Sequence, residues 1–476
     1  MTRHTGVFVS MWTLLVVRNS LAATQIVAEV ATLEAAMSDA VAGDVILIAD
    51  GTYRIESGLR ATAAGTALAP IVLAAQHPGA VLIESDTVEA IKISGPYWQV
   101  LDLTIRGVCA DHNACEHALH IVGAADGTLV RGNTFVDFNA QIKGNGEDYG
   151  AGFEWPDDVV VEGNVFYDEG PRQTANPVTK IDVVGGQRWR VEANEIRDFE
   201  KGQGDTISYG AFFKGHSKDG VFERNLVVCT SRNEAGVRIG LSLGGGGTSP
   251  DSICEDGTCT PEHERGTIRN NLIVHCSDVG VYLNEAFDSR IDHNTLFDTT
   301  GVDVRFPESS AFIDANLVDS NIRERDGGVF TEGFNLANVG TDLLRTWFVD
   351  PDGLDFGLVV GAGFVDAGSA EDPVTDDFCG ALRDDAPDLG ALEYTTDMPC
   401  ATDHAFPGTV GESTSGAPTD TAGPTSGTGG SNASSPAGCG CATGPARSLL
   451  VGFGGILWGL RLRRAPHTRP FRLRNR

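Results

Sequence analysis

Two cationic side chains could act together on an acidic sugar. Lys214 lies in the stretch GAFFKG, and Arg238 lies within GVRIG further along the chain. A β-elimination on a uronic acid needs a base for the proton beside the carboxylate, and a positive group for the charge that develops there. A lysine serves as this base only where a neighbouring cation lowers its pKa, and arginine can also hold the carboxylate with two hydrogen bonds. Lys214 and Arg238 are therefore the predicted catalytic pair.

Other residues near this pair in the sequence could bind the sugar or a metal ion. Tyr149 and Trp155, in the loop NAQIKGNGEDYGAGFEWP, offer flat rings for stacking, and His216 is expected in the turn after the strand that carries Lys214. The predicted substrate-binding residues are Asp182, Tyr282, Asn284, Arg305, His216, Tyr149 and Trp155. Asp182, Asp205 and Glu285 are the only nearby carboxylates for a divalent cation.

A repeated motif indicates the scaffold that positions these residues. The pattern apolar-x-x-Asn-x-apolar recurs at Asn133, Asn164, Asn194, Asn225, Asn271, Asn294 and Asn316, with steps of 31, 30, 31, 46, 23 and 22 residues. A period of about 22 residues, lengthened by insertions, is typical of one coil of a parallel β-helix. Asparagine tolerates left-handed backbone and can bond to the turn of the next coil, so these asparagines are predicted to form a structural ladder. A leucine-rich solenoid has a similar period, but its leucine spacing is absent.

The two ends of the repeat region resemble a known superfamily. Residues 32–43 (TLEAAMSDAVAG) predict a short helix, and DVILIADGTYRI after it predicts the first strand and turn. This combination is similar to the N-terminal cap of right-handed parallel β-helix proteins of the pectin-lyase-like superfamily, and DFCGALRDDAPDLGALEY resembles their closing segment. The resemblance covers roughly residues 26–396. It implies an all-β fold, a right-handed parallel β-helix with a short N-terminal capping helix, and leaves the activity open.

An alignment of the coils on their inward apolar residues predicts which side chains share the outer face. We aligned GVRIGLS, GVYLNEA and GVDVRFP on the valine after the first glycine, with Val237 and Ile239 inward. One outward column then contains Asp182, Phe212, Arg238, Tyr282 and Asp303, and the next contains Val184, Lys214, Gly240, Asn284 and Arg305. Lys214 and Arg238 are thus expected on adjacent coils, within reach of one sugar.

These two residues also resemble the site of polysaccharide lyase family six, the chondroitinase B and alginate lyase group. The resemblance implies that Lys214 is the base and that Arg238, in VRIG, is the family's arginine. The family holds calcium with a Glu-x-Glu pair just before its lysine, whereas Ile207 and Tyr209 stand there in this sequence, and the spacing from lysine to arginine is longer. Calcium is therefore an open cofactor, and the expected substrate is a uronic-acid-containing polysaccharide.

Two other functions compete with this interpretation. A glycoside hydrolase needs two carboxyl groups about 5 to 9.5 Å apart on one face, but Asp157 and Asp158 lie together in a turn upstream of the candidate face. A glycan-binding or adhesive β-helix without catalysis is the stronger alternative, because an outward lysine is often only a solvated surface residue. A lyase on polysaccharide remains the leading prediction.

The chain ends predict export. Residues 1–23 have the layout of a secretory signal peptide, and residues 24–400 are the expected β-helix domain. Residues 401–437 form a linker rich in Ser, Thr, Gly and Pro, and residues 438–476 combine a Cys motif, a short apolar helix and a basic tail. This last segment resembles the MYXO-CTERM type of sorting signal, and a simple tail anchor is the alternative. Both place the protein at a cell surface or membrane.

Charge and cysteines limit the partners and the compartment. Lys and Arg total 35 against 65 Asp and Glu, a net charge of −30, so nucleic acid is an unsuitable partner. Ten cysteines in an exported chain favour disulfides. The expected pairs join Cys109 to Cys115, Cys229 to Cys276, Cys254 to Cys259 and Cys379 to Cys400. The alternative for CADHNACEHALH is a zinc cluster of Cys109, Cys115, His112, His117 and His120.

Overall fold

The described residues include most of the predicted repeat region. The computed structural model describes residues 22–231, 235–245, 248–359, 361–369 and 374–394. The chain divides into two compact units, Met1–Ser413 and Thr414–Arg476, and every described residue belongs to the first. Residues 1–21 of the expected signal segment, the linker and the basic tail lie outside the described residues. Among the described helices, none has the length and apolar character needed to cross a membrane.

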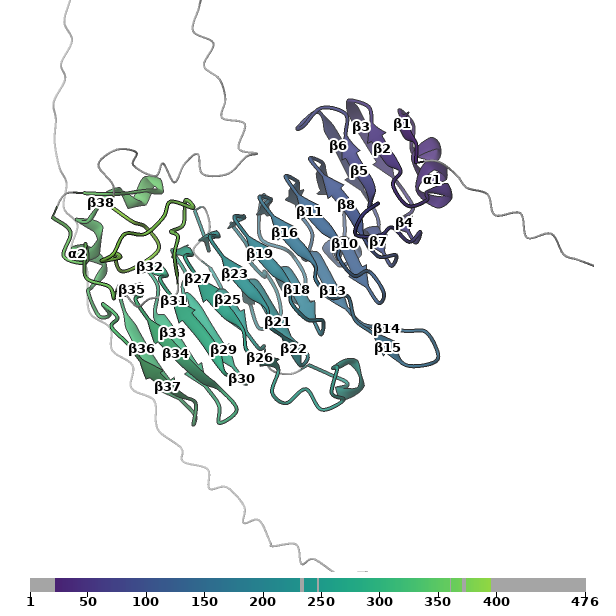
Figure 1. Ribbon diagram of the computed structural model, residues 1–476. Helices are drawn as coiled ribbons and strands as arrows, with labels where there is room; N and C mark the ends of the chain where they lie inside the picture. The colour runs from purple at the N-terminus through teal and green to yellow at the C-terminus, as the bar shows by residue number, and fades with distance from the viewer. Residues whose placement is uncertain (1–21, 232–234, 246–247, 360, 370–373, 395–476) are drawn as a thin grey trace, which may run out of the picture. The chain divides into compact units, whose positions relative to one another are not determined.

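Three long parallel sheets form the structure, and the chain passes through one strand of each sheet in every coil (Figure 1). Sheet A contains β1 (Thr24–Val27), β2 (Val45–Ile48), β5 (Ile71–Ala75), β8 (Trp98–Leu101), β11 (Leu129–Arg131), β16 (Val160–Glu162), β19 (Arg190–Glu192), β23 (Val221–Glu223), β27 (Thr267–Arg269), β31 (Ser289–Asp292), β34 (Ser310–Asp314) and β37 (Val329–Glu332). Sheet B contains β3 (Gly51–Ile55), β6 (Val81–Ser85), β9 (Thr104–Gly107), β12 (Thr134–Val136), β17 (Val165–Tyr167), β20 (Glu195–Arg197), β24 (Leu226–Val228), β28 (Leu272–Val274), β32 (Thr295–Phe297) and β35 (Leu317–Val318). Sheet C contains β4 (Leu59–Ala61), β7 (Glu89–Ile93), β10 (His117–Val122), β13 (Ala140–Asn145), β18 (Val178–Val184), β21 (Ile207–Lys214), β25 (Val237–Leu243), β29 (Val281–Asn284), β33 (Gly301–Arg305) and β36 (Asn321–Arg325). The fold is the predicted right-handed parallel β-helix.

Shorter elements lie at the corners and ends of the coils. The helices are α1 (Val30–Asp39) and α2 (Thr341–Arg345), with 3₁₀ turns η1 (His112–Ala114), η2 (Asp251–Ile253) and η3 (Pro351–Gly353). The small sheets pair β14 (Glu147–Asp148) with β15 (Phe153–Glu154), β38 (Phe348–Asp350) with β39 (Asp355–Leu358), and β22 (Ser217–Lys218) with β26 (His263–Glu264) and β30 (Ala286–Phe287). The short elements between β9 and β31 belong to insertions that lengthen individual coils, whereas α1 lies at the N-terminal end and α2, η3, β38 and β39 follow β37.

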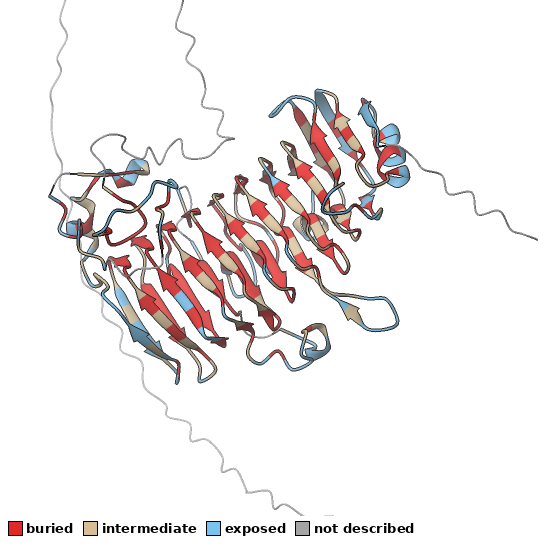
Figure 2. Cartoon of the chain, viewed as in Figure 1, coloured by how far each residue is buried: buried red, intermediate tan, exposed pale blue. Residues whose placement is uncertain are grey.

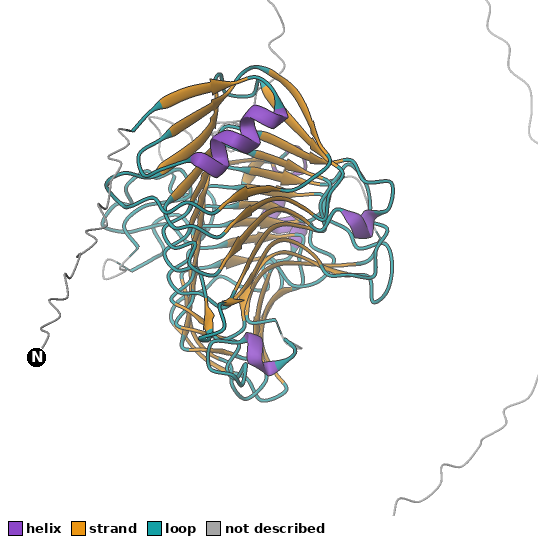
Figure 3. Cartoon of the chain, turned by 90° about the vertical axis from the view of Figure 1, so that its right-hand side faces the viewer, coloured by secondary structure: helices purple, strands orange, loops and turns teal. Residues whose placement is uncertain are grey.

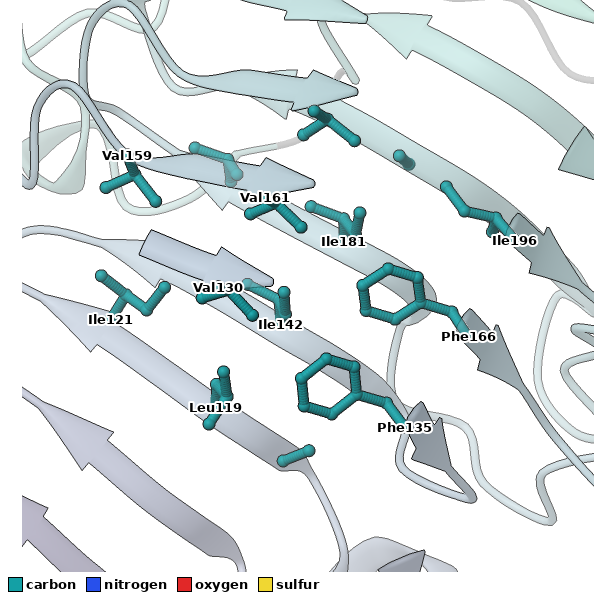
Figure 4. Packing of buried hydrophobic residues seen from close by; sticks show 14 of the residues in the cluster. Leu119, Ile121, Val130, Phe135, Ile142, Val159, Val161, Phe166, Ile181 and Ile196 are labelled. Carbon is teal, nitrogen blue, oxygen red and sulfur yellow. The ribbon is translucent and has the colours of Figure 1, made fainter. Parts of the chain in front are cut away.

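Like residues stack on like residues through the interior of the coils. The inward positions are nearly all aliphatic or aromatic, and strands alternate buried with more exposed residues (Figure 2). Figure 4 shows the inward side chains of neighbouring coils in rows, among them Phe135 and Phe166, whose rings stack 5.0 Å apart. Because each row is completed only by the next coil, the apolar surface of one coil is buried by its neighbours.

The predicted asparagine ladder is present at the corner between sheets A and B. From Asn133 to Asn316 the asparagine side chain of each coil is buried and bonds to the neighbouring coils; Asn164 Nδ2, for example, donates to Val130 O of the preceding coil at 2.9 Å and to Asn194 Oδ1 of the next coil at 3.0 Å. Asn335 extends the row by one further coil, since its Oδ1 accepts from Asn316 Nδ2 at 2.9 Å. The left-handed residue of each turn is the one before the asparagine, such as Ala193 with φ 53°. The asparagines are therefore required for their hydrogen bonds, not for left-handed backbone.

Other segments cover the N-terminal end of the coil stack and the outer face of sheet B. Helix α1 buries Leu33, Ala36 and Met37, at helical spacing, and lies across the first strands (Figure 3). The helix begins two residues before the start of the predicted range of 32–43 and ends four residues before the end of that range. The segment after β37 packs on the outer face of sheet B, where Phe348, Phe356, Phe378 and other apolar residues form one cluster with that sheet. The outer face of sheet C is not part of this cluster.

Within the described residues, three of the predicted disulfides are confirmed: Cys109 with Cys115, Cys229 with Cys276, and Cys254 with Cys259. The pair of Cys109 and Cys115 replaces the alternative of a zinc cluster. Cys229 and Cys276 join neighbouring coils, as predicted from their similar places in the repeat. Cys400, the predicted partner of Cys379, lies outside the described residues.

Candidate functional site

The outer face of sheet C has three columns of outward side chains rather than two. In β21, Gly210 and Ala211 both face the interior: a Cβ on Gly210 would meet side-chain atoms of Val227 and Phe199 at 3.2 and 3.4 Å. This local irregularity turns Tyr209 as well as Phe212 outward, and their rings lie edge to face 5.4 Å apart. The outward columns of β21 thus contain Tyr209, Phe212 and Lys214.

The predicted position of Arg238 in this face is wrong. In the register of β21 and β25, Ser242 lies opposite Phe212, whereas Arg238 lies opposite Ser208, at the start of the strand. Arg238 is 1% exposed; its Nη1 donates to Ala235 O at 2.6 Å and lies 3.5 Å from Glu200 Oε2. It lines a pocket of about 620 Å³ near the corner between sheets B and C, with His275 and Asp298. Lys214 and Arg238 therefore do not form the expected pair.

The error has a physical cause that the sequence also contains. We aligned Gly236 with Gly280, but the glycine that stacks on Gly280 is Gly240, because a Cβ at Gly240 would meet Gly280 O at 2.3 Å. Gly210, Gly240 and Gly280 form one row at the irregularity in sheet C, and Leu241 and Leu243 are the inward residues of β25. Aligning the coils on these glycines would have placed Gly244, not Gly240, beside Lys214 and Asn284.

A buried ion pair lies at the centre of the outer face. Lys143 on β13 and Asp182 on β18 are opposite each other on adjacent coils, and Lys143 Nζ donates to Asp182 Oδ1 at 2.7 Å. The side chain of Asp182 is 6% exposed and that of Lys143 is 18% exposed. Burial acts to raise the pKa of Asp182, but the ammonium groups of Lys143 and Lys214 outweigh it, so the pKa lies below its usual value. Asp182 is therefore a carboxylate at neutral pH. Sequence reasoning missed Lys143, although it falls in the same outward column.

Lys214 lies on the next coil, two residues beyond the position opposite Asp182. Its Nζ is 4.7 Å from the centre of the Phe212 ring, and among the described residues it has no hydrogen-bonding or ion-pairing partner. Burial lowers the pKa of Lys214; the charge of Asp182 acts against this shift and that of Lys143 adds to it. Lys214 thus combines a lowered pKa with a nitrogen that no protein acceptor occupies.

Two histidines extend the polar surface toward the N-terminal coils. His120 Nδ1 lies 2.6 Å from Glu89 Oε1, and its Nε2 lies 2.7 Å from Asn145 Oδ1. The hydrogen bond from His120 lowers the pKa of Glu89 to about 2 against the effect of burial, and Arg60 adds to the lowering. The ring of His117 lies 5.0 Å from that of His120, and burial lowers the pKa of His117 to about 4. His117 is therefore neutral at pH 7, beside the ion pair of Lys143 and Asp182.

Tyr149 and Trp155, the two residues predicted to stack on a sugar, lie in and beside the short sheet of β14 and β15. Strands β14 and β15 pair with each other, and Trp155 follows β15 directly. The Trp155 ring stacks on that of Phe153 at 5.6 Å, and Trp155 Nε1 donates to Ile253 O at 3.2 Å. Tyr149 is half exposed, with its hydroxyl 3.4 Å from Glu147 Oε2. Trp155 also lines a pocket of about 410 Å³ with four carboxylates, those of Asp126, Glu154, Asp157 and Glu255.

The long loop after β25 covers Lys214 from the other side. Glu262 anchors this loop, because its Oε2 accepts from Gly215 N at 2.6 Å and from Thr248 Oγ1 at 2.9 Å. A Cβ on Gly245 would lie 3.3 Å from Lys214 Cδ, so the loop backbone is in contact with the lysine stem. His216 lies in the turn after β21, as expected, and its Nδ1 bonds to Pro261 O at 2.9 Å. His216 thus helps to hold the loop and is 8% exposed.

The remaining predicted sugar-binding residues lie on the C-terminal coils. Tyr282 follows Ser242 in the column of Asp182, and Asn284 and Arg305 are opposite each other in the column of Lys214. Arg305 Nη1 donates to the Tyr282 hydroxyl at 2.9 Å, and Arg305 Nε bonds to Asp326 at 2.6 Å. Tyr282 and Asn284 are only 6% and 7% exposed. Arg323 and Arg325 on β36 pair with Asp303 and have side chains that are 43% and 38% exposed, so a sugar on these coils would meet mainly arginine side chains.

The predicted calcium ligands do not come together. Asp182 is bonded to Lys143, and Asp205 is exposed and bonded to Lys201 at 2.8 Å. Glu285 lies in the turn after β29, where burial and the charges of Glu262 and Glu308 raise its pKa. Within the described ranges, no group of three or more His, Cys, Asp or Glu side chains is arranged to hold a metal ion. The residues present therefore do not fit calcium.

Comparisons with known proteins agree with this fold. Residues 27–149 match the Chondroitinase B family. The structure of the pectate lyase Pel9A superposes with a TM-score of 0.52 at 16% identity, covering 76% of this chain and 90% of that one. An alginate lyase from Paenibacillus sp. str. FPU-7 gives a TM-score of 0.39 at 14% identity, covering 66% of this chain and 99% of that one. No curated protein matches the sequence. The chain thus resembles polysaccharide lyases in fold, and the matched family region includes Lys143 but not Lys214.

Proposed function

We propose that this protein cleaves a uronic-acid-containing polysaccharide by β-elimination on the outer face of sheet C, with Lys214 as the base. The observation that carries the proposal is the state of Lys214. Its pKa is lowered by burial, its Nζ makes no hydrogen bond to the described residues, and it lies beside a second lysine and a carboxylate. A surface lysine without a function is normally solvated and keeps an ordinary pKa.

The proposed reaction breaks a C–H bond and a C–O bond of one uronate. The neutral Lys214 amine takes the proton from the carbon beside the carboxylate, and the electron pair forms a double bond to the neighbouring carbon. The glycosidic oxygen on that neighbouring carbon departs with the electron pair of the broken C–O bond and takes up a proton from solvent water, to which the Lys214 ammonium then returns its proton. The charge that develops on the carboxylate during this step needs a nearby cation.

The likeness to polysaccharide lyases supports the proposed activity. Residues 27–149 match the Chondroitinase B family, whose name describes action on an acidic glycan.

We further propose that the protein is exported and held at the cell surface by its C-terminal segment, where it meets extracellular polysaccharide. Three disulfides in the described residues fit an oxidising compartment.

An absorbance assay tests the activity. The purified protein is incubated with alginate, pectate, chondroitin and dermatan, and the unsaturated uronate product is followed in the ultraviolet. We expect a signal on at least one polymer, and a loss of at least about 100-fold for Lys214→Ala, in line with removal of a general base. Lys218→Ala, on β22 outside this face, is the matched control and should keep the wild-type rate.

Binding without cleavage is the second candidate, and one observation favours it. Arg238, the expected second cation, points away from the face. If no polymer yields unsaturated product but one of them is retained in a pull-down, the lyase proposal is wrong and the protein is a glycan-binding β-helix. Equal rates for Lys214→Ala and wild type would instead place the active site elsewhere.

A further inference from the structure

The calcium implied by the resemblance to polysaccharide lyase family six has no fitting site among the described residues, yet a uronate in this face still needs its charge neutralised. Ile207 and Tyr209 stand where that resemblance places the acidic pair, and Tyr209 turns an aromatic ring outward. Asp182, the one predicted ligand on the central coils, has its carboxylate bonded to Lys143. The positive charge beside Asp182 is therefore supplied by the ammonium group of Lys143, a part of the protein itself.

We propose that Lys143 takes the place of a metal ion in this site and binds the carboxylate of the uronate on which Lys214 acts. This inference rests on the proposed function, because it assumes that a uronate lies across Asp182 between the two lysines. It names Lys143 as a substrate-binding residue that the resemblance does not supply. It also predicts an activity that is independent of calcium.

The position of Lys143 fits this role. Lys143, Asp182 and Lys214 lie on three successive coils, each about 4.8 Å from the next, and the register places Asp182 between the two lysines. Lys143 is close enough to Lys214 for its charge to lower the pKa of Lys214. A sugar that contacts Lys214 through its proton-bearing carbon can therefore present the adjacent carboxylate to Lys143.

The hydrogen bonds of Lys143 leave room for a substrate. A lysine ammonium has three donors, and within the described residues Nζ of Lys143 makes one hydrogen bond, to Asp182. The side chain is held by Asp182 but is still 18% exposed, so it is not sealed off from the outer face. An ammonium beside the uronate carboxylate withdraws charge as the proton leaves, which is the role of a positive group in this elimination.

Asp182 and His117 complete the arrangement. Asp182 fixes the direction of the Lys143 side chain through a hydrogen bond of 2.7 Å. His117 is neutral at pH 7 and so adds no competing charge. Asp182 is therefore a positioning residue, and Lys143 is the group that touches the substrate.

The test measures binding in the absence of turnover and of calcium. Oligouronates of the polymer that binds wild type are titrated by calorimetry into the full protein carrying Lys214→Ala, in buffer with EDTA. We expect that adding Lys143→Ala weakens the binding at least tenfold, while Lys143→Arg recovers most of it because the charge remains. Lys218→Ala is the matched control and should bind as the Lys214→Ala parent does. A carboxyl-reduced, neutral form of the same oligosaccharide should lose no affinity when Lys143 is replaced.

Three outcomes overturn the inference: equal affinity with and without Lys143, binding of oligouronate that requires added calcium, or no binding of any uronate polymer to wild type in EDTA. Thermal unfolding of each variant checks that the fold is kept, and the arginine variant separates loss of charge from loss of structure. If wild type binds a polyuronate through Lys143 but produces no unsaturated sugar, the proposed lyase activity fails and the assignment of Lys143 stands.

Discussion

His263, on β26 at the end of the loop that covers Lys214, is buried and neutral. His263 is fully buried, its Nδ1 lies 2.7 Å from Ser217 Oγ, and its ring stacks on Phe213 at 5.7 Å. Burial lowers the pKa of His263 to about 3, and the charge of Asp219 acts against this shift. Between pH 6.5 and pH 3 the unfolded chain therefore binds a proton at this residue that the folded chain does not.

This difference predicts a pH-dependent effect of His263→Gln. As the pH falls through this range, His263 costs the wild type stability at up to about 1.4 kcal/mol per pH unit, a cost that the glutamine variant lacks. The variant should be less stable than wild type at pH 7.5, and the gap should narrow as the pH falls from 6.5 toward 4. Urea unfolding at each pH measures both. A gap that stays constant over this range would show that His263 does not titrate as described.

At the scale of elements, the asparagine ladder joins the turns between sheets A and B from Asn133 to Asn316. Asn194 Nδ2 donates to Val161 O, Glu192 O and Asn225 Oδ1, and its Oδ1 accepts from Asn164. We expect Asn194→Ala to lower the free energy of unfolding by about 3 kcal/mol or more, because it leaves buried backbone groups without partners. Asn335→Ala, at the half-buried end of the ladder, should cost clearly less. Equilibrium urea unfolding of the two variants makes the comparison; equal losses would contradict a cooperative ladder.

The elements also show where sequence reasoning succeeds and where it fails. The asparagine motif predicted the coils because one buried amide per turn is a strict chemical requirement. The inward valines of β29 and β33 predicted the outward places of Tyr282 and Arg305 in the same way. Arg238 was misplaced because β25 begins four residues earlier relative to Gly240 than β29 does relative to Gly280. In the sequence, Gly236 and Gly240 are equally good candidates to align with Gly280. Lys143 was missed because its importance depends on Asp182 of the next coil.

At the scale of the whole molecule, a strongly negative chain presents a small group of lysines. The net charge is −30, whereas Lys143 and Lys214 flank Asp182 on the outer face of sheet C. The long-range field therefore repels a polyuronate, and the attraction acts only at short distance. Salt screens the long-range part first.

This balance predicts an unusual salt dependence for the proposed ligand. The association rate of a polyuronate should rise several-fold between 10 and 150 mM NaCl, because screening removes the repulsion by the rest of the protein. Proteins that capture polyanions with broad basic patches show the opposite trend. Stopped-flow or surface-plasmon measurements on the Lys214→Ala variant give the rate without turnover. A steep fall of the rate with salt would mean that the polymer contacts a larger basic surface than the outer face of sheet C.

The unequal steps between the ladder asparagines carry a consequence for how such a molecule changes over time. The step from Asn225 to Asn271 spans 46 residues and that from Asn294 to Asn316 spans 22, yet both pairs make the same hydrogen bond. All surplus chain is therefore placed at the corners of the coils. Length along the axis can change only in whole coils, whereas a corner can gain or lose any number of residues. Evolution can thus lengthen or shorten the loops around Lys214 by single residues, while the stack of coils beneath them changes only by whole coils.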